Sequence, residues 1–253
     1  MKLSTLTYAQ RESLRKLIHV ALALVLIIPL TPEYASLFSY LGSTLDPALS
    51  SYTILLFSAL FVSTLRVRKP ELRDSIVRIT REARRTVLQR LKALGPLHEV
   101  VEDVERALDR AEEGFFSLIE SVERDYEKRY GYVAAICAVA SVLTSYALFG
   151  PAATARGILA LAIVDPTASL VTLFLPRGRK ILKHYAHSPL AAAALFTLAL
   201  VAFGEKPARA VILSLIAALI ELISPEDNLT LPFGVAGFHV LLSALSDLMH
   251  LPS

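Results

Sequence analysis

The chain has 253 residues, of which 54% are hydrophobic and 19% are charged, and its mean hydropathy is +0.53. The high mean hydropathy excludes a disordered protein. A soluble domain carries about 25% charged residues, so the low charged fraction also argues against an ordinary soluble globule. The single cysteine, Cys137, excludes an internal disulfide and a zinc site built from several cysteines, and the net charge of +3 is too small to indicate nucleic acid as a partner.

Apolar stretches along the chain predict an all-α fold, a polytopic transmembrane helical bundle of about seven spans. Several stretches are shorter than the roughly 20 residues that a full span needs. The fourth contains Asp165-Pro166, which predicts a break in that helix. The simpler interpretation of Asp165, as an alternative to a functional role, is a cap for the part that follows. In chain order the stretches cover residues 17–30, 52–65, 132–149, 152–175, 189–203, 208–223 and 233–248.

Residues 66–129 hold 15 of the 26 Lys and Arg residues and 14 of the 23 Asp and Glu residues, so they predict a soluble insertion in a membrane protein. Ten basic and three acidic residues give residues 66–92 a net charge of +7, and eleven acidic and three basic residues give residues 99–127 a net charge of −8. Gly95-Pro96 separates the two, and apolar residues recur in both at spacings of three and four. These features predict an antiparallel helical hairpin with a basic and an acidic arm. A solvated structural hairpin is the simpler interpretation, and binding of the basic arm to anionic lipids is the alternative.

The chain therefore divides into a transmembrane pair at residues 1–65, the hairpin at 66–129 and a transmembrane bundle at 130–253 that carries the predicted site. Lys and Arg mark the cytoplasmic ends of membrane spans. They precede the first span, follow the second as the basic arm, and follow the fourth in a loop that begins at Arg177, whereas residues 31–51 contain none. This distribution puts the N-terminus and the hairpin in the cytoplasm, and seven spans then put the C-terminus outside.

Polar residues near the ends of the spans gather on the side predicted to be cytoplasmic. Ionisable residues at membrane depth are candidates for a functional site. Carboxylates that hold Mg²⁺, beside Lys and Arg side chains that hold phosphate, indicate a nucleotide or phosphate site at the inner leaflet. A transporter of an anionic solute is an alternative, but it would place such groups near the midplane and contain internal repeats. The polar positions are Lys16, His19, Asp165, residues 177–183 and residues 221–228.

Four short motifs in this order resemble the polyprenol kinase family, which includes dolichol kinases, phytol kinases and CTP-dependent diacylglycerol kinases and is related to the phosphatidate cytidylyltransferases. The resemblance covers most of the hydrophobic chain but not the hairpin. The last motif is the most specific and the first the least. The motifs are Arg15-Lys16-x-x-His19, residues 124–128 (Arg-Asp-Tyr-Glu-Lys), Asp165-Pro-x-Ala-Ser169, and Glu221 followed by Asp227-Asn228-Leu-Thr-x-Pro.

The resemblance implies an integral-membrane kinase that transfers the γ-phosphate of CTP to a lipid alcohol, such as dolichol, a polyprenol or a related isoprenoid alcohol, with Mg²⁺ as cofactor. It implies catalytic roles for Asp165, Asp227 and Glu221, with Asp165 and Asp227 as metal ligands. Simpler interpretations are that the basic loop marks the inner side of the membrane and that Asp227 and Asn228 form a turn. The nucleotide- or phosphate-binding candidates are Ser169, Arg177, Arg179, Lys180, Lys183, Ser188 and Asn228, and the candidates on the lipid or headgroup side are Arg15, Lys16 and His19.

The chain departs from the family pattern after the third motif, where the family has a glycine-bearing basic loop and then Lys-Ser-x-Glu-Gly-Ser. Residues 183–188 read Lys-His-Tyr-Ala-His-Ser, so Lys183 and Ser188 remain while the glutamate and the glycine do not. His184 and His187 would share one side of a helix, but without a third ligand they do not indicate zinc. The departure favours one alternative, a non-catalytic member that acts through its hairpin. A cytidylyltransferase that makes a CDP-lipid is a second alternative, because the same acidic and basic groups would serve that reaction. Assembly of the chain into a homo-oligomer is a further alternative that the sequence leaves undecided.

Overall fold

The computed structural model describes residues 7–40, 44–68 and 125–248 without a gap, and between the last two ranges residues 75, 78, 79, 82–84, 86, 106–110 and 114. The contacts within the chain form two compact units. The first combines residues 1–12 with 60–132, and the second combines residues 13–59 with 133–253. The predicted site residues, apart from those in the second motif, lie in the second unit.

Most of the predicted charged hairpin lies outside the described residues, including Gly95, Pro96 and the start of the second motif. Within the first unit, the described helix α6 covers Asp125–Tyr130 and leads to Gly131, whose φ of 79° only glycine adopts easily. Arg84 and Asp109, one from each predicted arm, form an ion pair. The hairpin as a whole stays a prediction.

The N-terminal part of the chain forms three helices. Helix α1 covers Tyr8–Val25 and is followed by the 3₁₀ turn η2 at Ile28–Leu30, helix α2 at Pro32–Tyr40 and helix α3 at Pro47–Arg68. The prolines at residues 32 and 47 open their helices, as is typical of a residue with a fixed φ and no N–H group. Tyr52 of α3 is fully buried and donates a hydrogen bond of 2.6 Å to the Leu26 carbonyl oxygen.

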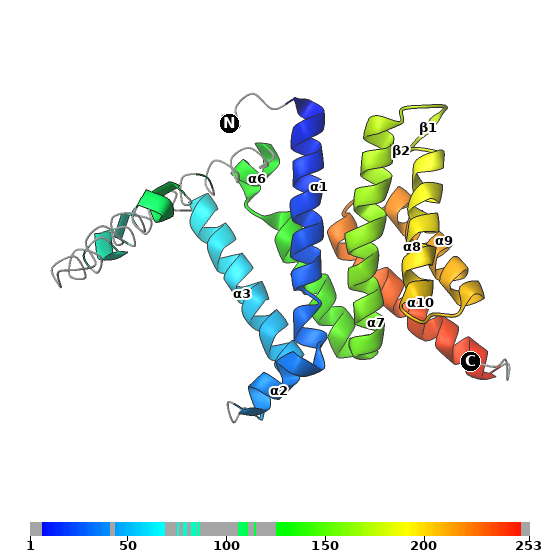
Figure 1. Ribbon diagram of the computed structural model, residues 1–253, viewed down its shortest axis with the longest axis horizontal. Coiled ribbons are helices and arrows are strands. Elements are labelled where there is room, and N and C mark those ends of the chain that lie inside the picture. The colour runs from blue at the N-terminus through cyan, green and yellow to red at the C-terminus, as the bar shows by residue number, and fades with distance from the viewer. Residues whose placement is uncertain are drawn as a thin grey trace. The chain divides into compact units, whose positions relative to one another are not determined.

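Helix α7, Val133–Phe174, corresponds to the third and fourth predicted spans and turns back on itself at Gly150 (Figure 1). Gly150 has φ 78° and ψ 176°, outside the helical region, and Pro151 opens the second half. The predicted break at Asp165-Pro166 is wrong, because the helix continues through both residues. Pro166 is buried within the bundle, where packing retains the helix despite one lost backbone hydrogen bond. Asp165 is therefore not a helix cap.

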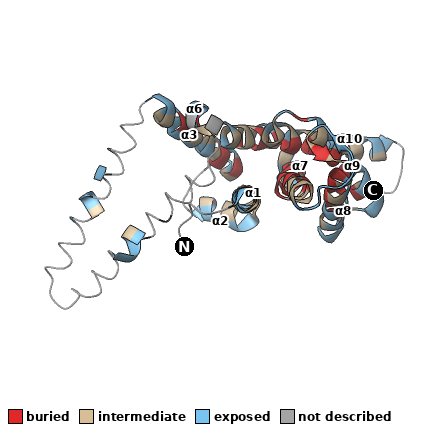
Figure 2. Cartoon of the chain, turned by 90° about the horizontal axis from the view of Figure 1, so that it is seen from above, coloured by how far each residue is buried: buried red, intermediate tan, exposed pale blue. Residues whose placement is uncertain are grey.

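The C-terminal part consists of α8 (His187–Ala202), α9 (Pro207–Ile223) and α10 (Asp227–Leu248), which pack with α7. Their shared core contains many small residues, which let helix backbones approach closely. Figure 2 shows the buried residues gathered along these helices. A departure from the all-α prediction is the short antiparallel hairpin of β1 (Lys180–Ile181) and β2 (His184–Tyr185) between α7 and α8. The core residues are Ala160, Val164, Ala168, Ala192, Phe196, Leu200, Ala210, Leu213, Ala217, Leu231 and Val235.

Four of the described helical segments are long and apolar enough to cross a membrane: Tyr8–Leu30, Pro47–Arg68, Val133–Phe174 and Asp227–Leu248. Many large apolar side chains on them are exposed, among them Leu17, Phe57 and Leu148. An apolar surface of this extent indicates contact with lipid. The coarse prediction of a helical integral-membrane protein is confirmed, while the count of seven spans stays a prediction.

Candidate functional site

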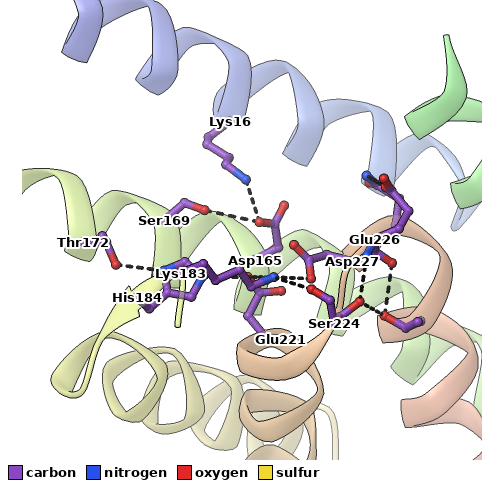
Figure 3. A network of polar contacts seen from close by, with 12 residues as sticks. Lys16, Asp165, Ser169, Thr172, Lys183, His184, Glu221, Ser224, Glu226 and Asp227 are labelled. Atoms are coloured by element: carbon purple, nitrogen blue, oxygen red, sulfur yellow. Dashed lines mark hydrogen bonds and ion pairs between the residues drawn. The ribbon is translucent and has the colours of Figure 1, made fainter. Parts of the chain in front are cut away.

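The centre of the candidate site is a group of three carboxylates from three helices (Figure 3). Asp165 comes from the second half of α7, Glu221 from the last turn of α9, and Asp227 from the first residue of α10. Each offers one oxygen, and these atoms all lie within 4.8 Å of one another. Asp165 and Glu221 are 4% and 1% exposed, so both acidic groups lie in an environment that ordinarily excludes charge.

The turn between α9 and α10 brings Glu221 and Asp227 together. Ser224 is buried, its hydroxyl accepts a hydrogen bond of 3.1 Å from the Glu226 backbone N–H, and it also pairs with the Thr230 hydroxyl. Asp227 then begins α10, where a carboxylate is favoured by the partial positive charge of the helix N-terminus. This short turn therefore supplies two of the three carboxylates.

Asp165 is held by residues of α1, of which Lys16 is 149 positions away in the sequence. Lys16 Nζ lies 2.6 Å from Asp165 Oδ1, and His19 Nε2 lies 3.4 Å from Oδ2. The Ser169 hydroxyl, one helical turn along α7, also donates to Oδ1 at 3.3 Å. The first and third motifs of the sequence thus meet at one carboxylate.

Lys183 reaches the other two carboxylates from the turn of the β1–β2 hairpin. Its Nζ pairs with Asp227 Oδ1 and lies 3.4 Å from Glu221 Oε1 and 3.4 Å from the Ser224 carbonyl oxygen. Leu182, the preceding residue, has φ 54°, which is strained for a side chain with a Cβ. Strain of this kind persists where surrounding contacts hold the chain, and here it presents Lys183 to the carboxylates.

His184, the first residue of β2, lies behind Glu221. Its Nε2 forms a hydrogen bond of 3.0 Å with Glu221 Oε1, and its Nδ1 forms one of 2.8 Å with the Thr172 hydroxyl. The Thr172 hydroxyl also pairs with the Ser188 hydroxyl, at 3.0 Å. Burial, and then the charge of Lys183, lower the pKa of His184 to about 4, so the ring is neutral at neutral pH.

The charges of the cluster do not cancel. Asp165, Glu221 and Asp227 carry three negative charges when ionised, and Lys16 and Lys183 supply two positive charges. Glu221 Oε2 is buried and has no hydrogen-bond partner among the described residues. A buried carboxylate oxygen without a partner is costly, and a cation is the partner that would remove the cost. Three carboxylates suit a hard divalent cation such as Mg²⁺, which binds oxygen.

The other predicted site residues lie around this centre in different ways. Arg177, Arg179 and Lys180 are exposed on the loop before Lys183. The Asn228 side chain donates to Glu226 Oε1 at 2.7 Å, and Arg15 adjoins Lys16 on α1. Ser188, predicted as a phosphate-binding residue, is fully buried behind His184.

One local prediction is wrong, and two residues of the site were missed. His184 and His187 do not share a helix face, because the first lies in β2 and the second begins α8. His187 Nε2 bonds the Leu175 carbonyl oxygen at 2.9 Å instead. Thr172 and His184 carried no signal in the sequence as members of the site. His184 lies in a strand of two residues, which is too short to show an alternation of apolar and polar residues. Thr172 reaches Ser188 only through tertiary packing.

Searches against protein-family models, curated proteins and solved structures found no match for this chain. The geometry of the site and the sequence motifs are therefore the basis on which a function can be proposed.

Proposed function

We propose that the protein is an integral-membrane lipid kinase that transfers the γ-phosphate of CTP to a lipid alcohol of the dolichol or polyprenol type at the cytoplasmic face. The observation that supports this proposal is the meeting of three of the sequence motifs at one place. Lys16 and His19 of the first motif contact Asp165 of the third, and Asp165 lies in the same carboxylate group as Glu221 and Asp227 of the fourth. CTP as the donor rests on the resemblance alone.

Phosphoryl transfer needs positioning and charge neutralisation more than covalent chemistry from the protein. In the proposed reaction the lipid hydroxyl oxygen forms a bond to the γ-phosphorus, the bond from that phosphorus to the β–γ bridging oxygen breaks, and CDP leaves. Asp165, Glu221 and Asp227 would hold Mg²⁺, which when bound neutralises charge on the transferred phosphoryl group.

The protein's own residues have separate tasks in this scheme. The exposed Arg177, Arg179 and Lys180 bind the outer phosphates, since guanidinium and ammonium groups are the usual protein partners of phosphate. Lys183 lies between this loop and the carboxylates and binds the phosphate nearest to them. A carboxylate of the cluster accepts the proton of the lipid hydroxyl.

The proposal also specifies the number of membrane spans and the side of the membrane on which each terminus lies. Seven spans place the N-terminus and the charged hairpin in the cytoplasm and the C-terminus outside. Lys and Arg in the loop of residues 177–183 support this orientation, because basic residues favour the cytoplasmic ends of spans. CTP is a soluble cytoplasmic metabolite, so the same orientation gives it access to the loop.

A turnover assay tests the proposal. The full-length protein in lipid nanodiscs receives Mg²⁺, a panel of isoprenoid alcohols and diacylglycerol, and CTP labelled at the α- or the γ-phosphate. We expect γ-label in the lipid and a loss of at least about 100-fold in Asp165→Asn, as is typical when one group that stabilises charge is removed. Asp247→Asn, an exposed position on α10, is the matched control and should leave the rate unchanged.

The position of the label separates the proposal from its alternatives. α-Label in the lipid would mean cytidylyl transfer, to be checked with phosphorylated lipids as substrates. An absence of label from CTP, ATP and GTP in every lipid would overturn both enzymatic functions and favour a non-catalytic role for the hairpin.

A further inference from the structure

The two carboxylate oxygens of Glu221 have different surroundings. Oε1 lies 3.0 Å from His184 Nε2 and 3.4 Å from Lys183 Nζ. Oε2 is buried and has no hydrogen-bond partner among the residues that the structure describes. The side chain as a whole is 1% exposed, so water does not ordinarily compensate Oε2. One oxygen is therefore held by the protein, and the other is left for a ligand.

The His184 ring that holds Oε1 is itself fixed from the opposite side. Its Nδ1 pairs with the Thr172 hydroxyl at 2.8 Å, and Thr172 pairs with Ser188 at 3.0 Å. These residues come from β2, α7 and α8, and both His184 and Ser188 are buried. Two hydrogen bonds on opposite ring nitrogens define the plane of the imidazole, so the ring cannot rotate without losing both (Figure 3).

We infer that His184 is a positioning residue, which orients the Glu221 carboxylate so that Oε2 faces a divalent cation shared with Asp165 and Asp227. This inference rests on the proposed metal site and assigns a residue that the sequence motifs do not include. Groups that orient metal ligands commonly matter as much as the ligands do, and their loss weakens metal binding by roughly 10- to 100-fold. A histidine that only filled space would not have this effect.

Direct binding of Mn²⁺, measured from the electron paramagnetic resonance signal of the free ion, tests the inference without an assay of turnover. The full-length protein is used in nanodiscs, and the thermal unfolding midpoint is recorded for each variant. We expect His184→Ala to weaken Mn²⁺ binding by roughly 10- to 100-fold. His184→Gln retains a polar group near the position of Nε2 and should restore most of the affinity. His187→Ala is the matched control, because that ring bonds the Leu175 carbonyl oxygen and should leave the affinity unchanged.

A second variant keeps the test decisive if His184→Ala fails to fold. Thr172→Val preserves side-chain volume and the imidazole but removes the hydroxyl that holds Nδ1, and we expect a smaller loss of affinity. If the folded His184→Ala protein bound Mn²⁺ with wild-type affinity while Asp165→Asn abolished binding, the metal site would stand but the positioning role of His184 would be overturned. A wild-type protein that binds no Mn²⁺ would overturn both. Mn²⁺ binding that depends on His184 in a protein without kinase turnover would support the inference and overturn the proposed function alone.

Discussion

Gly157 of α7 lies so close to the backbone of α10 that a Cβ at this residue would be 2.3 Å from the Pro232 carbonyl oxygen. Atoms cannot approach this closely, so the two helices would have to move apart if the glycine were replaced. Asp165 lies on the first helix and Asp227 on the second, each within a few turns of the contact. The close approach therefore sets the spacing between two of the three carboxylates.

We expect Gly157→Ala to reduce the free energy of unfolding by about 1–3 kcal/mol relative to a matched substitution, because overpacking forces the backbones to shift. The matched substitution is Gly237→Ala on α10, where the added Cβ would lie 3.4 Å from the Phe149 ring. Both changes gain the same helix propensity, so their difference reports the packing alone. Thermal unfolding in detergent measures it, and equal stability of the two variants would contradict the role of Gly157.

The pair of Lys16 and Asp165 leads to a second prediction. The side chains are 12% and 6% exposed, so removing the ammonium leaves a buried carboxylate with less compensation. We expect Lys16→Met to lower stability by roughly 3 kcal/mol, and the double variant with Asp165→Asn to recover part of the loss. Arg11→Met, at an exposed position of α1, should have little effect. Additive losses in the double variant would mean that the two side chains do not interact.

A third prediction concerns the opposing demands of stability and function at Glu221. The carboxylate is fully buried near Asp165 and Asp227, and its Oε2 lacks a partner among the described residues. We expect Glu221→Gln to raise the unfolding midpoint in the presence of a chelator, by an amount equivalent to about 1 kcal/mol, because one of three close negative charges is removed. The same variant should bind Mn²⁺ at least about tenfold more weakly than the wild type. A variant that is both less stable and unchanged in metal affinity would refute this account.

The sequence predicted much of the fold and the acidic part of the site. Apolar stretches extend over many residues and are easily recognised. The described helices α3 and α10 contain two of the predicted stretches, and the helical segment Tyr8–Leu30 covers a third. An acidic residue within an apolar stretch is rare unless it has a function, which is why Asp165 could be predicted.

Other parts of the site could not be predicted, for physical reasons. The continuation of α7 through Pro166 depends on packing against neighbouring helices, which local propensity does not contain. The approach of Lys16 to Asp165 joins residues 149 positions apart, and the resemblance suggested both residues without suggesting their contact. The contact between His184 and Glu221 is also tertiary, and its short strand has no period that a sequence could reveal.

A second group of charged residues, all partly buried, lies at the turn between α8 and α9, away from the carboxylate cluster. Glu205 Oε2 accepts a hydrogen bond of 2.8 Å from Arg156 of α7, and Oε1 lies 3.0 Å from Arg209 Nε of α9. His239 and Ser243 of α10 extend the group, since Arg209 donates to the backbone oxygen of the first and to the hydroxyl of the second. Glu205 therefore links three helices through its neighbours.

Burial raises the pKa of Glu205, but Arg156 and Arg209 outweigh burial and hold the pKa below its ordinary value. An acidic group with a lowered pKa stabilises the folded protein above the ordinary pKa, and the stabilisation is lost as the pH falls through the lowered value. We therefore expect Glu205→Gln to be less stable than the wild type by about 3 kcal/mol at neutral pH, and the difference to shrink steadily as the pH falls below about 4.5.

Unfolding midpoints of the two proteins across this pH range, in the same detergent, measure the difference directly. Asp247→Asn is the control, because an exposed carboxylate contributes little to stability. Other acidic groups titrate in both proteins and cancel in the comparison, so a pH-dependent gap belongs to residue 205. A gap between wild type and Glu205→Gln that stays constant from neutral to acidic pH would mean that the charge of Glu205 does not stabilise the turn, and that only the shape of its side chain does.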